Sequence, residues 1–357
     1  MSGRKKWRTL GSGVFALSLV GCAGHGPTVD SGPGVSATSA QQLGCATGPG
    51  VTQLYMLGEA AATQPVVAGD QVLLAVTESL LAVPVAGGAP NTLAVAEDPT
   101  APVVLDGIAY FQASAAVGVP DAQGKQLTQS QVYAVAVAGG NATPMPSLDT
   151  FTPVAADGSS LYLDENSLGF ERWTPPSGTA NDLAVDAGLL IDGMTIQGDY
   201  VYVAGQDIEV GGFLNGVIER IPKAGGSAER IVTGIGHPWN LVADSVALYW
   251  SEDPPGLYGV GPGRLARSSL DGKSAATVFD QTATSLVAAN GRLYFSLGTE
   301  VDSISTTGGP TTTIASGLAN AGLLAVAGSN VIWVDPYSQA LSGTASAVLM
   351  TACEPSQ

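Results

Sequence analysis

The sequence predicts an all-β protein, a β-propeller of seven four-stranded antiparallel blades, from three observations. A strand unit recurs about every 45 residues, glycine (47) and proline (22) are abundant while charged residues make up only 12%, and each end of the folded region holds one extra strand. A unit of this size cannot bury its own apolar face, so successive copies must stack against one another. The composition is typical of many short strands joined by turns.

Each repeat is centred on a short apolar strand that contains an anchor residue, usually an aromatic one. Seven anchors follow at spacings of 37, 52, 40, 47, 45 and 38 residues. They are Leu73, Tyr110, Tyr162, Tyr202, Tyr249, Tyr294 and Ile332. Small or polar turn residues before each anchor predict one hairpin. A second hairpin turn follows the first six anchors, at Gly87-Gly88, Gly139-Gly140, Ser177-Gly178, Gly225-Gly226, Asp271-Gly272 and Gly308-Gly309. Two hairpins give the four strands of a blade.

The two ends of the folded region predict how the ring closes. Only one strand, residues 346–352, follows the last anchor unit, and one unassigned strand, residues 52–57, precedes the first. Pairing them completes a seventh blade and removes the free edges that an open array would expose. Cys45 and Cys353 flank these strands, and in an oxidising compartment an even pair predicts a disulfide. The alternative is two free or metal-bound thiols.

Two segments carry a resemblance to known repeats. The stretches LYWSED and GRLARSSLDGKSA (residues 248–253 and 263–275) and VIERIPKAGGSAERI (217–231) resemble the YWTD and NHL-type β-propeller repeats of secreted proteins. The Tyr-Trp-Thr-Asp of the family stands here as Tyr249-Trp250-Ser251-Glu252. Because YWTD propellers have six blades, this resemblance leaves a six-bladed ring open as an alternative.

The N-terminus predicts an exported lipoprotein. Four basic residues among the first eight precede a short apolar run, residues 14–20, which is too short to span a bilayer. The following Leu-Val-Gly-Cys resembles the lipobox of bacterial lipoproteins, which implies lipidation of Cys22. We therefore expect a signal peptide at 1–21, a flexible tether at 22–44 and a propeller at 45–357. Ala23, which is not acidic, favours the outer membrane. The alternative is an ordinary secretory signal with an incidental cysteine.

The charge balance excludes one class of partner. All 30 acidic residues but only nine of the 13 basic ones follow residue 22, so the mature chain carries a net charge near −21. Such a surface repels nucleic acid and anionic lipid. We expect contact with the membrane only through the lipid anchor, and a monomer or a subunit of an envelope complex.

In a propeller, loops between blades surround the channel mouth, which is the default binding site. The candidate binding residues at these loops are Asp98, Phe151, Asp192, His237, Trp239, Asn240 and Asn320. The segment His237-Pro238-Trp239-Asn240 is the most distinctive, because it holds the only histidine of the folded domain. The alternative is that Trp239 packs between blades and His237 is an ordinary loop residue with its hydrogen bonds satisfied.

Acidic residues recur just after the anchor strands. They are Glu78, Asp164, Glu165, Asp207, Glu252, Asp253, Glu300 and Asp335. Three of them, Asp207, Glu252 and Asp253, border long segments (205–216 and 252–263) and are the candidate ligands for Ca²⁺, which prefers several oxygen ligands. Both segments are predicted to be loops between the second and third strands of a blade, and a third long loop of this kind is predicted at residues 112–131. The alternative is a solvated acidic rim without metal, and we expect no other cofactor.

The sequence favours binding over catalysis. It has no nucleophile elbow, no histidine pair for zinc and no phosphate-binding loop. We therefore expect an envelope-anchored binding or scaffolding module that contacts a protein, peptide or glycan through its channel-mouth loops. The main alternative is a metal-dependent propeller hydrolase or lyase that uses the rim carboxylates.

Overall fold

The computed structural model describes residues 51–58, 62–117, 127–148, 151–164, 170–175, 180–183, 188–207, 216–253, 263–335 and 347–353. The chain divides into two units, Met1–Thr38 and Ser39–Gln357. The first unit, with the predicted signal peptide and Cys22, lies outside the described residues, and so does Cys45 of the second unit.

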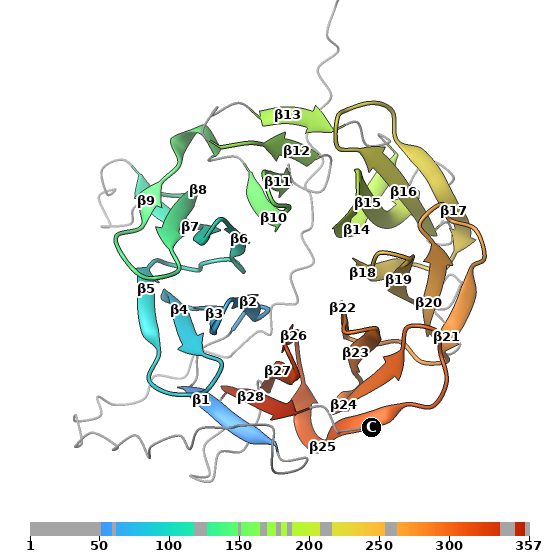
Figure 1. Cartoon of the computed structure of the whole chain (residues 1–357). Helices are drawn as coiled ribbons and strands as arrows, with labels where there is room; N and C mark the ends of the chain where they lie inside the picture. The colour runs from blue at the N-terminus through green and yellow to red at the C-terminus, as the bar shows by residue number, and fades with distance from the viewer. Residues whose placement is uncertain are drawn as a thin grey trace, which may run out of the picture. The chain divides into compact units, whose positions relative to one another are not determined.

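Seven four-stranded antiparallel sheets form the second unit and surround a common centre (Figure 1). Blade 1 contains β2 (Val66–Ala68), β3 (Gln71–Val76), β4 (Ser79–Pro84) and β5 (Asn91–Val95); blade 2 contains β6 (Val103–Leu105), β7 (Ile108–Val117), β8 (Leu127–Ala136) and β9 (Thr143–Pro144). Blade 3 contains β10 (Thr152–Ala156), β11 (Leu161–Asp164), β12 (Phe170–Trp173) and β13 (Ala180–Leu183); blade 4 contains β14 (Leu189–Gln197), β15 (Tyr200–Asp207), β16 (Gly216–Pro222) and β17 (Glu229–Ile235).

The remaining blades repeat this order. Blade 5 contains β18 (Pro238–Ala243), β19 (Ala247–Glu252), β20 (Arg264–Ser269) and β21 (Ala276–Phe279); blade 6 contains β22 (Ser285–Ala289), β23 (Arg292–Ser296), β24 (Gly298–Ser305) and β25 (Thr312–Ala321). Blade 7 contains β26 (Leu324–Ala327), β27 (Asn330–Asp335), β28 (Ala347–Cys353) and β1 (Thr52–Gly58). A 3₁₀ turn, η2 (Pro146–Leu148), precedes blade 3, and no helix in the described part of the chain is long and apolar enough to cross a bilayer.

Blade 7 closes the ring as the sequence predicts. Its outermost strand β1 comes from the start of the unit and pairs with β28 from the end, from Thr52 opposite Thr351 to Gly58 opposite Ala347. The predicted seven blades and the terminal pairing are therefore confirmed, and the six-bladed alternative is wrong. Cys353 ends β28, but the predicted bond to Cys45 stays a prediction because Cys45 is outside the described residues.

The hydrophobic core lies between the blades. All seven anchors sit on the second strand of a blade and are at most 7% exposed. Because side chains alternate across a strand, one blade contacts both neighbours. In β3, Leu73 faces blade 2 and packs with Phe111, whereas Leu74 faces blade 7 and packs with Ile332. Seven apolar clusters result, one for each of the seven blade interfaces.

The paired glycines form the predicted turns between the third and fourth strands. Gly225 and Gly226 have φ angles of 90° and 132°, and Gly308 and Gly309 have 86° and 121°. Residues with a Cβ rarely adopt such angles. In each of these turns the amide of the first glycine donates to the carbonyl three residues earlier. Of the predicted turns, only Ser177-Gly178 lies outside the described residues.

One predicted loop is mostly strand. Residues 112–131 were expected to form a long loop, but β7 continues to Val117 and β8 begins at Leu127, so the segment is the outer part of a hairpin. The intervening residues, like most of 205–216 and 252–263, lie outside the described residues. The β-branched residues Val117, Thr128 and Val132 favour a strand at these positions.

A recurring aspartate organises the turn between the first two strands of a blade. In blade 3, Asp157 accepts hydrogen bonds from the amides of Ser159 and Ser160 and from the Tyr162 hydroxyl, each at 2.9 Å. It also pairs with Lys223 of blade 4 at 2.9 Å. In blade 5, Asp244 accepts the equivalent bonds from two amides and from the Tyr249 hydroxyl.

We expect Asp157→Asn to lower the free energy of unfolding by about 1–3 kcal/mol at neutral pH. Burial would raise the pKa of the Asp157 carboxyl, but hydrogen bonds from Lys223, Ser159 and Tyr162 outweigh it and hold that pKa well below its ordinary value. This contribution is present above the unfolded pKa and is lost as the pH falls through the folded one. Urea titrations should show a smaller loss for the matched variant Asp244→Asn, since Asp244 has no cationic partner among the described residues. Equal losses would contradict a role for Lys223.

Candidate functional site

One face of the propeller collects the candidate residues. The loops that join consecutive blades and the loops between the second and third strands of a blade end on the same face, because first strands begin there and second strands end there. We call this the mouth face. The first strand of each blade lies innermost, around the centre (Figure 1).

Irregular first strands bring polar groups into the wall at the mouth face. The pairing of β14 with β15 skips Asp192, between Ile191 and Gly193. The pairing of β18 with β19 skips Asn240 and Leu241, and Asn240 has a φ of 51°. Bulges of this kind redirect side chains and are frequent near binding sites. Several residues expected in loops therefore lie in strands: Asp192 in β14, Trp239 and Asn240 in β18, and Asn320 in β25.

Three candidate residues meet at the interface of blades 4 and 5. Nε2 of His237 lies 2.9 Å from Oδ2 of Asp192, and Nδ1 lies 3.7 Å from Oδ2 of Asp253. The backbone supports the arrangement, because the Asp253 amide donates to the His237 carbonyl at 3.1 Å. All three side chains remain accessible, with 31%, 28% and 49% exposure for His237, Asp192 and Asp253. The protein thus presents an accessible histidine between two carboxylates.

The hydrogen bond that His237 donates to Asp192 raises the pKa of His237, although burial opposes this and the charge of Asp253 adds to it. We expect Asp192→Asn to lower the pKa of His237 in an NMR titration. The stabilisation from the charged pair is present below the unfolded pKa of about 6.5 and is lost as the pH rises through the folded value. The difference in unfolding free energy between the two proteins should therefore disappear at alkaline pH. A difference that stayed constant would mean that the pair does not titrate with His237.

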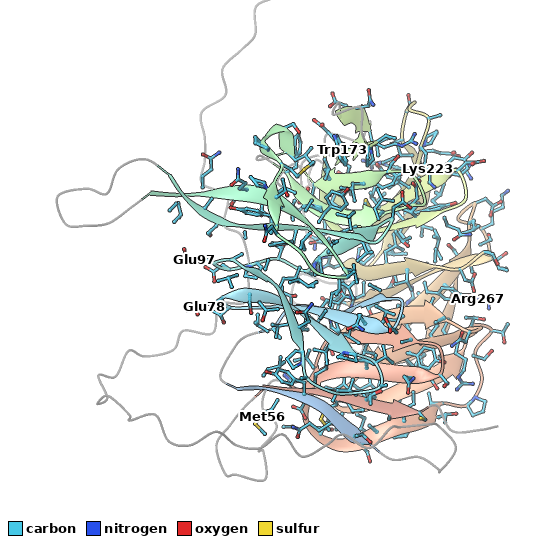
Figure 2. All side chains as sticks on the ribbon, turned by 60° about the vertical axis from the view of Figure 1, so that its left-hand side comes forward. Met56, Glu78, Glu97, Trp173, Lys223 and Arg267 are labelled. Carbon is cyan, nitrogen blue, oxygen red and sulfur yellow. The ribbon has the colours of Figure 1, made fainter. Side chains whose placement is uncertain are left out.

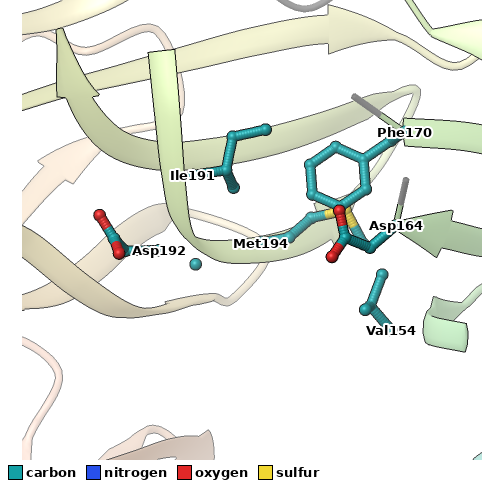
Figure 3. Close-up of a pocket in the computed structure, with 7 residues that line it drawn as sticks. Val154, Asp164, Phe170, Ile191, Asp192 and Met194 are labelled. Carbon is teal, nitrogen blue, oxygen red and sulfur yellow. The ribbon is translucent and has the colours of Figure 1, made fainter. Parts of the chain in front are cut away.

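Next to this cluster is a pocket of about 200 Å³ between blades 3 and 4. It is lined by Val154, Asp164, Phe170, Ile191, Asp192, Gly193 and Met194. Figure 3 shows Val154, Asp164, Phe170 and Met194 gathered on one side and Asp192 on the other. Asp192 therefore belongs to both features, since it borders the pocket and bonds to His237. The pocket combines apolar walls with carboxylates, which suits a ligand with an apolar part and a positive charge.

The other candidates occupy separate positions around the mouth face. Asp98 is exposed, and its amide donates to Thr77. Phe151 is half-buried between blades 2 and 3, and its carbonyl accepts a hydrogen bond from Gln112. Asn240 Nδ2 donates to the Ala283 carbonyl at 3.4 Å, and the backbone amide of Asn320 donates to Asp335 at 3.3 Å. Nε1 of Trp239 is buried and has no hydrogen-bond partner in the described part of the chain.

The three acidic residues predicted as calcium ligands differ in burial and in the side chains that they contact. Glu252 is 2% exposed and accepts hydrogen bonds from Arg264 (2.6 Å) and from the Trp250 ring nitrogen (2.8 Å). Asp207 is 4% exposed and pairs with Arg230. Asp253 instead faces His237. Among the described residues, no three acidic, histidine or cysteine side chains are grouped as a metal site would require.

The sequence did not indicate the apolar walls of the pocket. Val154, Ile191 and Met194 belong to first strands, where an apolar residue predicts only packing. A usable signal was present in β14, because the charged Asp192 interrupts an otherwise apolar start of an innermost strand. A bulge is the simplest way to place such a residue at the mouth.

Comparison with known proteins supports the fold alone. No protein-family model and no curated protein matches the sequence. The β-propeller domain of the Trilobed protease from Pyrococcus furiosus is 13% identical, with a TM-score of 0.58 over 77% of this chain and 91% of that one. The structural likeness is to protease propellers. No match supports the YWTD or NHL resemblance at the level of family.

Two full peptidases contain a similar domain. An acylaminoacyl peptidase in complex with Z-Gly-Gly-Phe-chloromethyl ketone is 12% identical, with a TM-score of 0.61 over 84% of this chain and 52% of that one. A prolyl endopeptidase is 12% identical, with a TM-score of 0.55 over 85% and 51%. This chain thus spans about half the length of these enzymes, and identities this low carry no conclusion about activity.

Proposed function

We propose that this protein is an envelope-anchored binding module that holds a protein or peptide ligand at the mouth face. The observation that carries the proposal is the pocket between blades 3 and 4, where the carboxylate bonded to His237 borders an apolar cavity. The ligand group that fits this chemistry is a peptide amino terminus whose first side chain is apolar. The ammonium would face Asp192 and Asp164, and the side chain would contact Phe170, Ile191 and Met194.

The size and charge of the pocket support this class of ligand. A cavity of about 200 Å³ has room for one side chain, since a site for a single water needs only about 10–15 Å³ on the same measure. A carboxylate beside a half-enclosed apolar site favours a cation over an anion. The acidic balance of the chain, −17 in formal charge, acts in the same direction by attracting positively charged ligands.

Calorimetry with the dipeptide Val-Gly tests the site. We expect the free dipeptide to bind and its N-acetylated form not to bind. Asp192→Asn should weaken the interaction about tenfold or more, because it removes the charge that faces the ammonium. Asp199→Asn is the matched control, since it removes the same charge from a turn at the opposite end of β14. Equal effects of the two variants, or equal binding of the acetylated dipeptide, would contradict the proposal.

We further propose that Cys22 is lipidated and anchors the protein in the outer membrane. The support is the basic start, the apolar run and the position of the cysteine in the sequence. Cells given an alkyne-labelled fatty acid should incorporate label into the protein but not into Cys22→Ala. Label in the variant would contradict lipidation at this residue.

A further inference from the structure

A second concave surface lies between blades 1 and 2, away from the pocket of blades 3 and 4. The hairpin of β7 and β8 pairs over ten residues in each strand, from Ile108 opposite Ala136 to Val117 opposite Leu127. Its neighbours are much shorter, with three residues in β6 and two in β9. The outer half of the hairpin therefore extends beyond its own blade (Figure 2).

The projecting hairpin and the edge of blade 1 enclose a groove of about 770 Å³. One wall is the end of β5 and the residue after it, Ala94 to Ala96. The opposite wall comes from the face of the hairpin that is turned toward blade 1, where Phe111 stacks on Tyr133 with ring centroids 5.7 Å apart. Val95 is 86% exposed, the highest value among the large apolar side chains of the described residues. The groove thus has an apolar wall and an apolar, solvent-facing rim.

Backbone groups border this groove as well. β5 is the outermost strand of blade 1 and pairs only with β4, so one of its edges is free of any strand in the described part of the chain. The loop after β5 is fixed to β7 through the bridge between Glu97 and Ser114. This bridge closes one end of the groove, whereas the outer edge of β5 has no strand paired to it among the described residues. A free strand edge beside an apolar groove is the geometry that accepts an added strand from a partner.

The charges around the groove define the partner. The described residues of blades 1 and 2 include five acids, Asp70, Glu78, Glu97, Asp98 and Asp106, and no lysine or arginine. Glu78 and Glu97 line the groove, and both are exposed. Figure 2 shows them on the side from which the hairpin projects, whereas Lys223 and Arg267 lie on the opposite side. A bound segment would therefore meet these carboxylates, with no lysine or arginine among the described residues of the two blades.

We propose that a basic, extended segment of another protein binds this groove as a fifth strand on the β5 edge of blade 1. Its apolar side chains would alternate with lysine or arginine. The apolar ones would pack against Val95 and Tyr133, and the basic ones would approach Glu78 and Glu97. Main-chain hydrogen bonds to β5 would supply affinity, and the alternating side chains would supply specificity.

A fluorescein-labelled heptapeptide of alternating lysine and valine is the probe, measured by anisotropy with peptide and protein concentrations up to about 1 mM. We expect it to bind, and we expect neither the glutamate–valine counterpart nor a backbone N-methylated form to bind. Hydrogen exchange of the β5 amides should slow in the presence of the probe. Absence of binding, or binding of all three peptides, would overturn the proposal.

Two valine substitutions locate the site. Val95→Lys places a like charge and a longer side chain in the groove and should weaken binding of the lysine–valine peptide by about tenfold or more. Val246→Lys is the matched control, because Val246 is also highly exposed (71%) but lies in blade 5. Both residues are at the surface, so neither change should prevent folding. Equal affinity of the two variants would overturn the proposal, and Asp192→Asn should leave this binding unchanged because the two sites are separate.

Discussion

Replacing Arg230 with methionine is expected to lower the free energy of unfolding by about 3–5 kcal/mol at neutral pH. Arg230 on β17 bonds to two buried carboxylates of the same blade, Glu219 on the adjacent strand β16 and Asp207 at the end of β15. These side chains are 4% and 1% exposed, so removing the guanidinium takes the opposing charge from two acids that water hardly reaches. Methionine keeps most of the length of the side chain. The loss of stability therefore reports mainly the removed charge and only slightly a change in packing.

The matched control for this change is Arg220→Met in the same blade. Arg220 pairs with Glu229, whose side chain is 61% exposed, and surface pairs of this kind contribute about 1 kcal/mol or less. Urea unfolding of the two variants should therefore differ several-fold in the loss of stability. Lowering the pH should restore part of the stability that Arg230→Met loses, because protonation of Asp207 and Glu219 removes their uncompensated negative charge. Equal losses in both variants would contradict the assignment of Arg230 as the main cation of this cluster.

Replacing Cys353 with serine is expected to cost about 2–5 kcal/mol, the second large effect. Cys353 ends β28, the strand that pairs with β1 to close the ring. The sequence predicts Cys45 as its partner, which would join the start and the end of the propeller. A bond across so long a loop restrains the unfolded chain strongly in the entropic account.

The measurement uses the mature domain without Cys22, so that only two cysteines remain. Urea unfolding is measured with and without a reductant. The reductant should lower the free energy of unfolding of the parent protein to that of Cys353→Ser, and it should leave that of the variant unchanged. If the reductant does not change the free energy of unfolding of the parent protein, no disulfide contributes to its stability. Mass spectrometry of a non-reduced digest would then identify the pairing directly.

The fold was predictable because the repeat is a packing pattern. Anchor residues such as Tyr162 and Tyr249 recur because each must fill an interface between blades, and the paired glycines recur because each turn needs positive φ angles. Closure was predictable for a similar reason, since a leftover strand at each end has only one place to pair. These requirements are local and repeated, so they are visible in one sequence.

The site was only partly predictable, because its residues come together through irregularities that do not repeat. Asp192 and His237 were expected near the mouth, but their hydrogen bond depends on the bulge in β14. The acids after the anchor strands share a position in the repeat and yet have different surroundings. Glu252 is buried against Arg264, whereas Asp253, the next residue, faces His237. Sequence position alone does not separate a structural carboxylate from an accessible one.

The location of the core between blades has a consequence for how this protein unfolds. In a linear stack of units, an end unit can detach after losing one interface. In this ring every blade has two neighbours, so the first blade to leave must break two apolar clusters at once. Detaching the first blade therefore costs more free energy than detaching any later one. As a result, partly opened forms are rarely populated compared with the fully unfolded chain. We expect a slow, all-or-none loss of structure and long survival in the presence of proteases.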